Sequence, residues 1–169
     1  IMDKTKQFVE RGKQLGISFW VDTADVALIR QATGLGGDGA TTNPNLTAVE
    51  VKKGTYTQVI QQFLSDLRKA GKVTAATPSR DVVHFVEFEL RKYMALERTP
   101  LVARDLSVEV SPLIDEMRHL SVQEKEALIY NEGKALGQLD PKVVIKIGFS
   151  EWGLLAARRL QEEGFRVNM

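Results

Sequence analysis

The sequence predicts an α/β fold in which parallel strands form an open sheet or a barrel. Short apolar segments rich in β-branched residues alternate along the chain with helical patterns, and this order is typical of βαβ units. The chain has 169 residues, of which 43% are hydrophobic and 27% are charged. It is therefore long enough for one domain with a sizeable core.

The first half of the chain contains two expected strands and a long helical segment. Gly16 ends the first helix, and the glycine-rich residues 34–39 end the second. Pro44 stops the second strand because proline has no N–H group to donate to a sheet. The expected elements are a helix over 3–15, a strand over 17–24, a helix over 24–33, a strand-like segment over 39–46, and helical patterns over 55–70 and 80–97.

The second half contains two further strands and the start of another. Ser121 and Glu124 have capping-box spacing, in which each side chain bonds to the backbone N–H of the other residue, and they open a helix. Gly164 is expected to end the last helix. The expected elements are a strand over 103–112, a helix over 121–136, a strand over 142–147, a helix over 151–163 and the beginning of a fifth strand over 165–169.

Composition argues against several classes of function. Lys and Arg number 23 against 22 Asp and Glu, so the net charge is near +1 and no overall field favours a nucleic acid or an anionic membrane. The chain has no cysteine, hence no disulfide framework, thiolate nucleophile or cysteine-based metal site, as expected in a reducing cytoplasm. His84 and His119 lie in helical patterns without metal-ligand spacing, and structural or surface roles are expected for both.

No membrane-spanning or export segment is expected. No apolar run approaches the ~18 to 20 residues needed to cross a bilayer. The N-terminal sequence IMDKTKQFVERGKQLG has charges where a signal peptide needs an apolar core. A soluble, cytoplasmic protein is therefore expected.

The segment KVVIKIGFSEWGLL, residues 142–155, places a lysine in the middle of an apolar strand. A parallel strand that is buried on both faces is expected to be almost entirely Val, Ile and Leu. An ammonium group in such a place is unfavourable unless it is paired or loses its charge. Either this is an edge strand, or Lys146 has a chemical role. Lys142 shares its face but stands at the start of the strand after Pro141, where a solvated side chain is expected.

Each expected strand carries a polar side chain near its carboxyl end. Side chains alternate between the two faces of a strand, and active sites of parallel α/β proteins are built at the carboxyl ends. These side chains are therefore expected to converge on one pocket. Taken singly, each of them could instead face solvent or cap the next helix. The residues that share a face are Trp20 with Asp22, Thr41 with Asn43, Ser107 with Glu109, and Val144 with Lys146.

A buried amine beside carboxylates suits Schiff-base chemistry. Desolvation lowers the pKa of a lysine in general, and a neutral amine attacks a ketone to form an imine. The protonated imine draws electrons from a neighbouring carbon–carbon bond, which breaks when a carboxylate removes the proton of the adjacent hydroxyl group. This is the chemistry of a class I aldolase.

The candidate residues lie in the segments FWVDTADVALI, GATTNPNL, LSVEVSP and KVVIKIGFSEWGLLAARRLQEEGFRVNM. In this order, the segments resemble the Asp-bearing first strand, the TTNP signature, the Glu-bearing third strand and the Schiff-base lysine strand of the transaldolases. The resemblance implies a (β/α)8 TIM barrel, of which this chain covers about the first half, four βα units and the start of strand 5. Residues 1–169 would then be one partial barrel domain, with an N-terminal helix over 3–15 and a helical insert over 47–100 between strands 2 and 3.

The resemblance also implies an activity and the residues that perform it. A transaldolase of the non-oxidative pentose phosphate pathway moves a dihydroxyacetone unit from sedoheptulose 7-phosphate or fructose 6-phosphate to an aldose phosphate, without a cofactor or metal. Lys146 would form the Schiff base, and Asp22 would be the general acid and base at the donor's C4 hydroxyl group. Glu109 would activate the water that moves protons during imine formation. Asn43 would hydrogen-bond the dihydroxyacetone hydroxyl groups, and Thr41 would support it.

Two alternatives remain open. The first is a half-barrel that is catalytically incomplete. In the transaldolase family, a catalytic threonine and the phosphate-binding residues come from later strands. A half-barrel also has open edges, with which another chain can pair. The chain would then be an assembly or binding module, or a homo-oligomer.

The second alternative is a fructose-6-phosphate aldolase. These aldolases resemble the same pattern, but they carry an amide at the position of Glu109 and lack the long insert. Glutamate therefore favours transfer between sugars over simple aldol cleavage.

Overall fold

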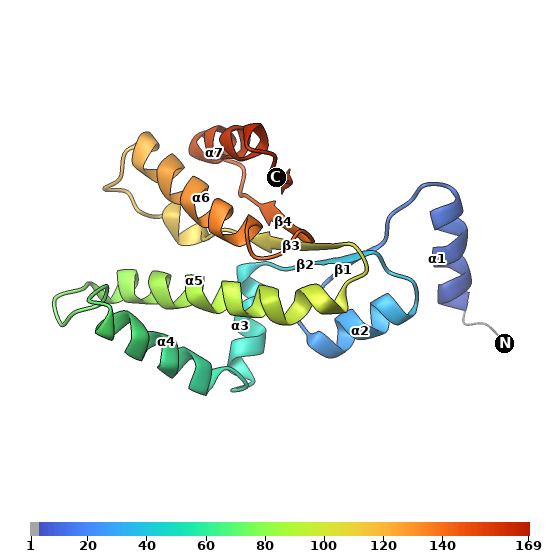
Figure 1. Cartoon of the computed structure of the whole chain (residues 1–169), viewed down its shortest axis with the longest axis horizontal. Coiled ribbons are helices and arrows are strands. Elements are labelled where there is room, and N and C mark those ends of the chain that lie inside the picture. Colours follow the sequence, from blue (N-terminus) through green and yellow to red (C-terminus); the bar gives the residue numbers. More distant parts are fainter. Residues whose placement is uncertain (1–3) are drawn as a thin grey trace.

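The computed structural model describes residues 4–169, in which strands alternate with helices (Figure 1). In chain order the elements are α1 (Lys4–Gln14), β1 (Trp20–Asp22), α2 (Val26–Gly34), β2 (Gly39–Thr41), α3 (Pro44–Lys52), α4 (Thr57–Lys69), α5 (Ser79–Arg98), the 3-10 helix η1 (Thr99–Leu101), β3 (Asp105–Glu109), the 3-10 helix η2 (Pro112–Ile114), α6 (Val122–Gly137), β4 (Val143–Lys146), α7 (Glu151–Glu162) and β5 (Val167–Asn168).

The strands of the described residues form one sheet in the order β1-β2-β3-β4-β5, and every neighbouring pair is parallel. Parallel neighbours need a crossover connection, and one or more helices supply it between each pair of strands. Within residues 4–169, β1 and β5 are the two edges of the sheet. The predicted α/β class with a parallel sheet is confirmed.

The two faces of the sheet differ because side chains alternate along each strand. In β3, Leu106 and Val108 point into the main hydrophobic core, and in β4 Val143 and Ile145 do the same. Helices cover this face, to which α2, α5, α6 and α7 contribute Ile29, Ala95, Ile129 and Leu160 respectively. The alternate residues of β3 and β4 lie on the opposite face. The polar side chains of the strands are therefore gathered on the face away from the helices.

The segment between β2 and β3 contains α3, α4 and α5, which build a second, smaller core. Arg98, at the end of α5, is only 1% exposed and joins this segment to β1. Its guanidinium group donates to the carbonyl oxygen of Ala24 at 2.6 and 2.8 Å and to the hydroxyl group of Tyr56 at 3.0 Å. The second core contains Ala24, Tyr56, Leu90 and Met94.

Helix α3 was not expected, because Pro44 was interpreted only as the end of a strand. The strand β2 stops at Thr41, and Asn43 is the N-cap of α3, where its side-chain oxygen accepts a hydrogen bond of 3.0 Å from Leu46 N. Pro44 occupies the first helical turn, where the missing N–H group has no partner to lose. The same residue thus ends the strand and begins a helix.

Several expected helix ends agree with the structure. Ser121 and Glu124 form the capping box of α6, and Gly16 and Gly164 adopt the left-handed conformation, with φ of 78° and 86°. His119, expected in a helical pattern, lies in a turn between η2 and α6 because the helix begins only after Ser121. The glycines of residues 34–39 have GxGxxG spacing, but they follow a helix and precede a strand, the reverse of the order in a dinucleotide-binding motif.

Helix α1 lies apart from the sheet and its covering helices, as Figure 1 shows. It corresponds to the helix expected over 3–15, of which residue 3 lies outside the described residues. Val9 is buried, and Lys13 Nζ forms an ion pair of 3.1 Å with Asp38, next to the start of β2. These contacts place α1 at the amino-terminal end of the sheet, away from the strand ends where a site is expected.

Candidate active site

Lys146 and Glu109 form an ion pair at the carboxyl ends of β4 and β3. The two residues are in register across the neighbouring strands, and Lys146 Nζ lies 3.1 Å from Glu109 Oε2. The side chains are 31% and 17% exposed, respectively. An amine and a carboxylate thus meet at the end of the sheet where parallel α/β proteins build their sites.

The alternation of each strand fixes the direction of this pair. Ile145 and Ile147 are buried in the core beneath the helices, so Lys146 between them must lie on the other face. Val108 and Val110 orient Glu109 in the same way. The apolar neighbours of Lys146 in sequence therefore anchor the strand. They do not surround the amine, which has a carboxylate partner and partial contact with solvent.

Asp22 ends β1 on the same face, two strands away from Glu109 and three strands away from Lys146. It is in register with Thr41 of β2, which is in register with Ser107 of β3. The Asp22 side chain is exposed, and no hydrogen bond or ion pair of it occurs within residues 4–169. The structure therefore places Asp22 on the same face as Lys146, but the two side chains are not in contact.

Thr41 and Asn43 lie between Asp22 and Glu109. Thr41 is the last residue of β2 and is partly buried. Asn43, besides capping α3, lines a small cavity of about 10 Å³ together with Glu109 and Arg91. This volume is close to the minimum for one water molecule. Glu109 thus pairs with Lys146 and shares a small cavity with Asn43, whereas no hydrogen bond joins Asn43 to Lys146 within residues 4–169.

Asn168 is a residue of this face that was not among the candidates. It lies on β5 in register with Lys146, and its Nδ2 donates a hydrogen bond of 3.2 Å to Ser107 Oγ. The row Glu109, Lys146 and Asn168 therefore runs across three strands. The alternation of FRVNM, in which Asn168 is the polar residue at the end of a strand, is the signal that could have identified it.

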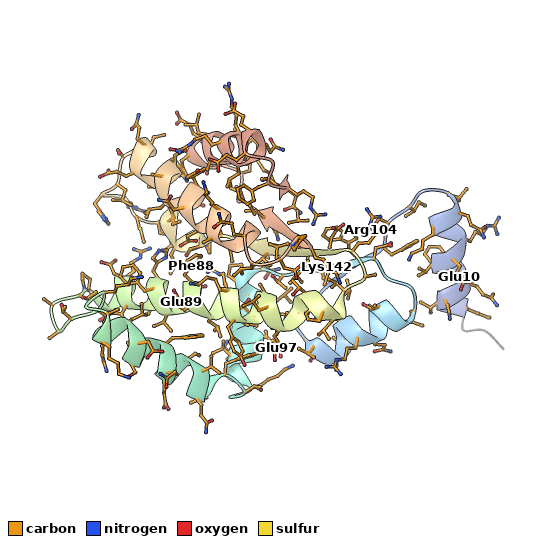
Figure 2. All side chains as sticks on the ribbon, viewed as in Figure 1. Glu10, Phe88, Glu89, Glu97, Arg104 and Lys142 are labelled. Atoms are coloured by element: carbon orange, nitrogen blue, oxygen red, sulfur yellow. The ribbon has the colours of Figure 1, made fainter. Side chains whose placement is uncertain are left out.

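Lys142, the second lysine of the β4 segment, has a structural position. Its Nζ donates hydrogen bonds to the carbonyl oxygens of Thr99 at 3.2 Å and Val102 at 2.8 Å. In Figure 2 it lies beside the C-terminal end of α5, at the start of the strand. The expected solvated side chain is found only in part, because Lys142 is partly buried and its amine donates to carbonyl groups that follow α5. Lys142 directly precedes β4 and Lys146 is its last residue, so the two lysines lie at opposite ends of the strand.

The described residues offer no alternative centre of metal chemistry. No group of three or more His, Asp or Glu side chains within residues 4–169 could hold a metal ion. His84 is buried in α5 beside Ser111 and Glu132, and His119 is exposed. Among the helices of the same range, none is long and apolar enough to cross a membrane.

Comparison with known proteins agrees with this geometry. A family profile described as Transaldolase/Fructose-6-phosphate aldolase matches residues 19–169. The chain belongs to this family. The resemblance to transaldolases in the strand segments is therefore confirmed, and the five parallel strands are those of a partial TIM barrel.

Individual transaldolases are similar to the chain at low identity. The transaldolase of Trichormus variabilis is 26% identical over 166 residues, which cover 98% of this chain and 48% of the relative. A probable transaldolase of Bdellovibrio bacteriovorus is 30% identical over 154 residues, 90% of this chain and 49% of the relative. The transaldolase of Thermosynechococcus vestitus is 28% identical over 148 residues, 88% of this chain and 36% of the relative. The chain thus spans about half the length, or less, of these transaldolases.

Proposed function

We propose that the protein is a transaldolase that carries a dihydroxyacetone unit on Lys146, from a ketose phosphate to an aldose phosphate. The observation that carries this proposal is the ion pair of Lys146 with Glu109 at the carboxyl ends of adjacent strands. Membership of the transaldolase/fructose-6-phosphate aldolase family supports it. The proposed substrates are fructose 6-phosphate or sedoheptulose 7-phosphate as donor, in the non-oxidative pentose phosphate pathway of the cytoplasm.

The first step joins the donor to the lysine. The neutral amine of Lys146 attacks the C2 carbonyl carbon of the ketose, which forms a carbinolamine, and loss of water gives the protonated imine. This step needs a base to take a proton from the ammonium group and an acid to help the hydroxyl group leave. Glu109, 3.1 Å from Nζ, is the group in position to move these protons, directly or through a water molecule.

The second step breaks the donor. Removal of the C4 hydroxyl proton turns C4 into an aldehyde, the C3–C4 bond breaks, and its electron pair enters the protonated imine to give an enamine. The aldose phosphate leaves, and the enamine then attacks the aldehyde carbon of the acceptor with return of the proton. Asp22 is the proposed base and acid for this proton, because it is the other carboxylate at a strand end of this face.

Asn43 and Thr41 are proposed to hold the three-carbon unit. Asn43 uses its oxygen to cap α3, so its amide nitrogen is the group that would donate to a hydroxyl group of the donor. A helix cap and a substrate contact are therefore compatible in this one side chain.

Trapping with borohydride tests the assignment. The purified protein is treated with fructose 6-phosphate and borohydride, and the modified peptide is identified by mass spectrometry. A reduced three-carbon adduct is expected on Lys146. It should be absent in Lys146→Arg and retained in Lys142→Arg, since arginine can donate to the same carbonyl groups as Lys142. An adduct on another lysine would overturn the proposal. The absence of any adduct in a protein preparation that has full activity would also overturn it.

Aldol cleavage is the second candidate, because the matching family includes fructose-6-phosphate aldolases. The two activities differ in their need for an acceptor. A transaldolase turns over fructose 6-phosphate only when an aldose phosphate such as erythrose 4-phosphate is added. Release of free dihydroxyacetone without an acceptor would favour the aldolase.

A further inference from the structure

A buried cluster of charged and polar side chains lies behind the carboxyl end of β3, on the side covered by helices. Helix α5 contributes His84, Glu87 and Arg91, and α6 contributes Glu132. Ser111, the next residue but one after Glu109, completes it. All of these residues are buried except Glu87, which is partly exposed. The cluster thus joins two helices to the segment that leaves β3.

Glu132 is the centre of this cluster. Its Oε2 accepts a hydrogen bond of 2.8 Å from Ser111 N, and its Oε1 lies 3.2 Å from His84 Nε2. His84 Nδ1 lies 3.2 Å from Ser111 Oγ. Arg91 Nη1 is 3.9 Å from Glu132 Oε2, and its Nη2 pairs with Glu87. One carboxylate therefore connects both helices to the backbone at the end of β3.

Stability alone does not account for a carboxylate in this place. Glu132 is 6% exposed, and burial raises its pKa to about 7 although the Ser111 N–H group and Arg91 act to lower it. Within the described part of the chain, Glu132 Oε1 and Arg91 Nη1 lack a well-directed hydrogen bond. Well-packed apolar residues of similar volume often replace buried ion pairs without loss of stability. The cluster therefore calls for a role other than packing.

Glu132 is linked to Glu109 by two routes. The first is the backbone, because the Ser111 N–H group that Glu132 holds is separated from Glu109 by Val110 alone. The second passes through Arg91, which lines the small cavity that Asn43 and Glu109 also line. A second cavity of about 20 Å³ is lined by Glu109 and Ser111 among other residues. Both cavities border the end of β3, which is therefore not closely packed on every side.

We propose that Glu132 is a positioning residue for Glu109. By accepting the Ser111 N–H group, it fixes the end of β3 and keeps the Glu109 carboxylate beside Lys146 Nζ. The predicted effect of Glu132 on turnover rests on the proposed function. For the geometry of Glu109 and Lys146, the inference stands on the contacts alone.

Three variants separate the hydrogen bond from the charge. Glu132→Gln keeps an oxygen that accepts the Ser111 N–H group, whereas Glu132→Leu removes it at similar volume. Glu126→Leu is the matched control, because Glu126 lies on the same helix and forms an ion pair of 2.7 Å with Arg159 on α7. Circular dichroism establishes that each variant is folded.

Two measurements need no sugar. Amide hydrogen exchange at Ser111 is expected to rise at least about tenfold in Glu132→Leu, since its N–H group loses a buried acceptor. Acetylation of Lys146 at limiting acetic anhydride, quantified by mass spectrometry, is expected to change several-fold, because Glu109 no longer holds the amine. Glu132→Gln and Glu126→Leu should stay close to the unchanged protein in both measurements.

Turnover provides the catalytic measurement. Glu132→Leu should lower kcat about 10- to 100-fold with little change in KM, as expected for a misplaced catalytic group, and Glu132→Gln should restore most of it. If Glu132→Leu does not fold, Ser111→Pro replaces it, because the φ of −63° at Ser111 suits proline and the N–H group is removed.

The outcomes distinguish this inference from the proposed function. Equal behaviour of Glu132→Leu and Glu126→Leu in exchange, acetylation and turnover would overturn the positioning role and leave the transaldolase proposal intact. Absence of any sugar adduct, together with a changed acetylation rate in Glu132→Leu, would overturn the transaldolase proposal and support the positioning role. For Ser111→Pro, which has no N–H group at position 111, acetylation and turnover alone are compared with Glu126→Leu, and they decide in the same way.

Discussion

The pH dependence of stability is expected to change when Glu132 is replaced by glutamine. Burial raises the pKa of Glu132 from 4.5 to about 7, so the folded chain binds this proton more tightly than the unfolded chain does. The contribution of Glu132 is therefore most favourable below about pH 4.5, becomes less favourable as the pH rises to about 7, and is constant above it. His84 acts in the opposite sense, because burial lowers its pKa and stability is lost as the pH falls below about 6.5.

The magnitude follows from the raised pKa. At about 1.36 kcal/mol per pH unit, the change from 4.5 to about 7 corresponds to about 3 kcal/mol of unfolding free energy. Glu132→Gln removes this term and leaves the groups that face Glu132 in place, which are His84, Glu87, Arg91 and Ser111. Any penalty of the new amide beside Arg91 does not depend on pH. The slope of the difference, rather than its absolute value, is the quantity to measure.

Urea unfolding followed by tryptophan fluorescence measures this slope. The free energy of unfolding is determined between pH 5 and 8 for the unchanged protein, Glu132→Gln and the control Glu126→Gln. From pH 5 to pH 8, the free energy of unfolding of Glu132→Gln minus that of the unchanged protein is expected to increase by most of the ~3 kcal/mol. For the control, the same difference is expected to stay constant. A flat or falling difference for Glu132→Gln would refute the assignment of a raised pKa to this group.

Three further substitutions have expected outcomes. Glu109→Gln should slow formation of the Lys146 adduct about 10²- to 10⁴-fold, the usual contribution of a general acid or base, and rapid-quench borohydride trapping measures this rate. Arg98→Met should lower the free energy of unfolding by about 2–5 kcal/mol, because the buried carbonyl oxygen of Ala24 loses its donor; an unchanged urea midpoint would contradict this. Ser121→Ala should cost about 1 kcal/mol through loss of the α6 cap, and thermal unfolding would show a matching decrease in Tm.

Local patterns in the sequence were sufficient for the alternating elements and for the face on which Lys146 lies. Period-two alternation placed Ile145 and Ile147 opposite Lys146, and the structure has them buried beneath the helices. Helix α3 was missed because the pair Asn43 and Pro44 was interpreted only as the end of a strand. The same pair is also an N-cap followed by proline at the first helical turn, which is a recognisable helix start.

Contacts between distant segments could not be predicted in the same way. His84 and Glu132 meet across two helices, and no short-range pattern relates their positions. Arg98 reaches Ala24 across the whole helical segment that follows β2. Their burial depends on how α5 and α6 cross the sheet, which periodicity within one helix does not specify. The distance of Asp22 from Lys146 is likewise a property of sheet curvature rather than of strand sequence.

The register of β3 and β4 has a consequence for how this scaffold can change. Backbone hydrogen bonding between neighbouring strands sets the separation of Glu109 and Lys146, since each is the last residue of its strand. The loops that follow can therefore be altered in length and chemistry while Glu109 and Lys146 keep their spacing, provided that Ser111 keeps its hydrogen bond to Glu132. Under the proposed function, changes in these loops would alter which sugars bind and leave the reacting pair in place.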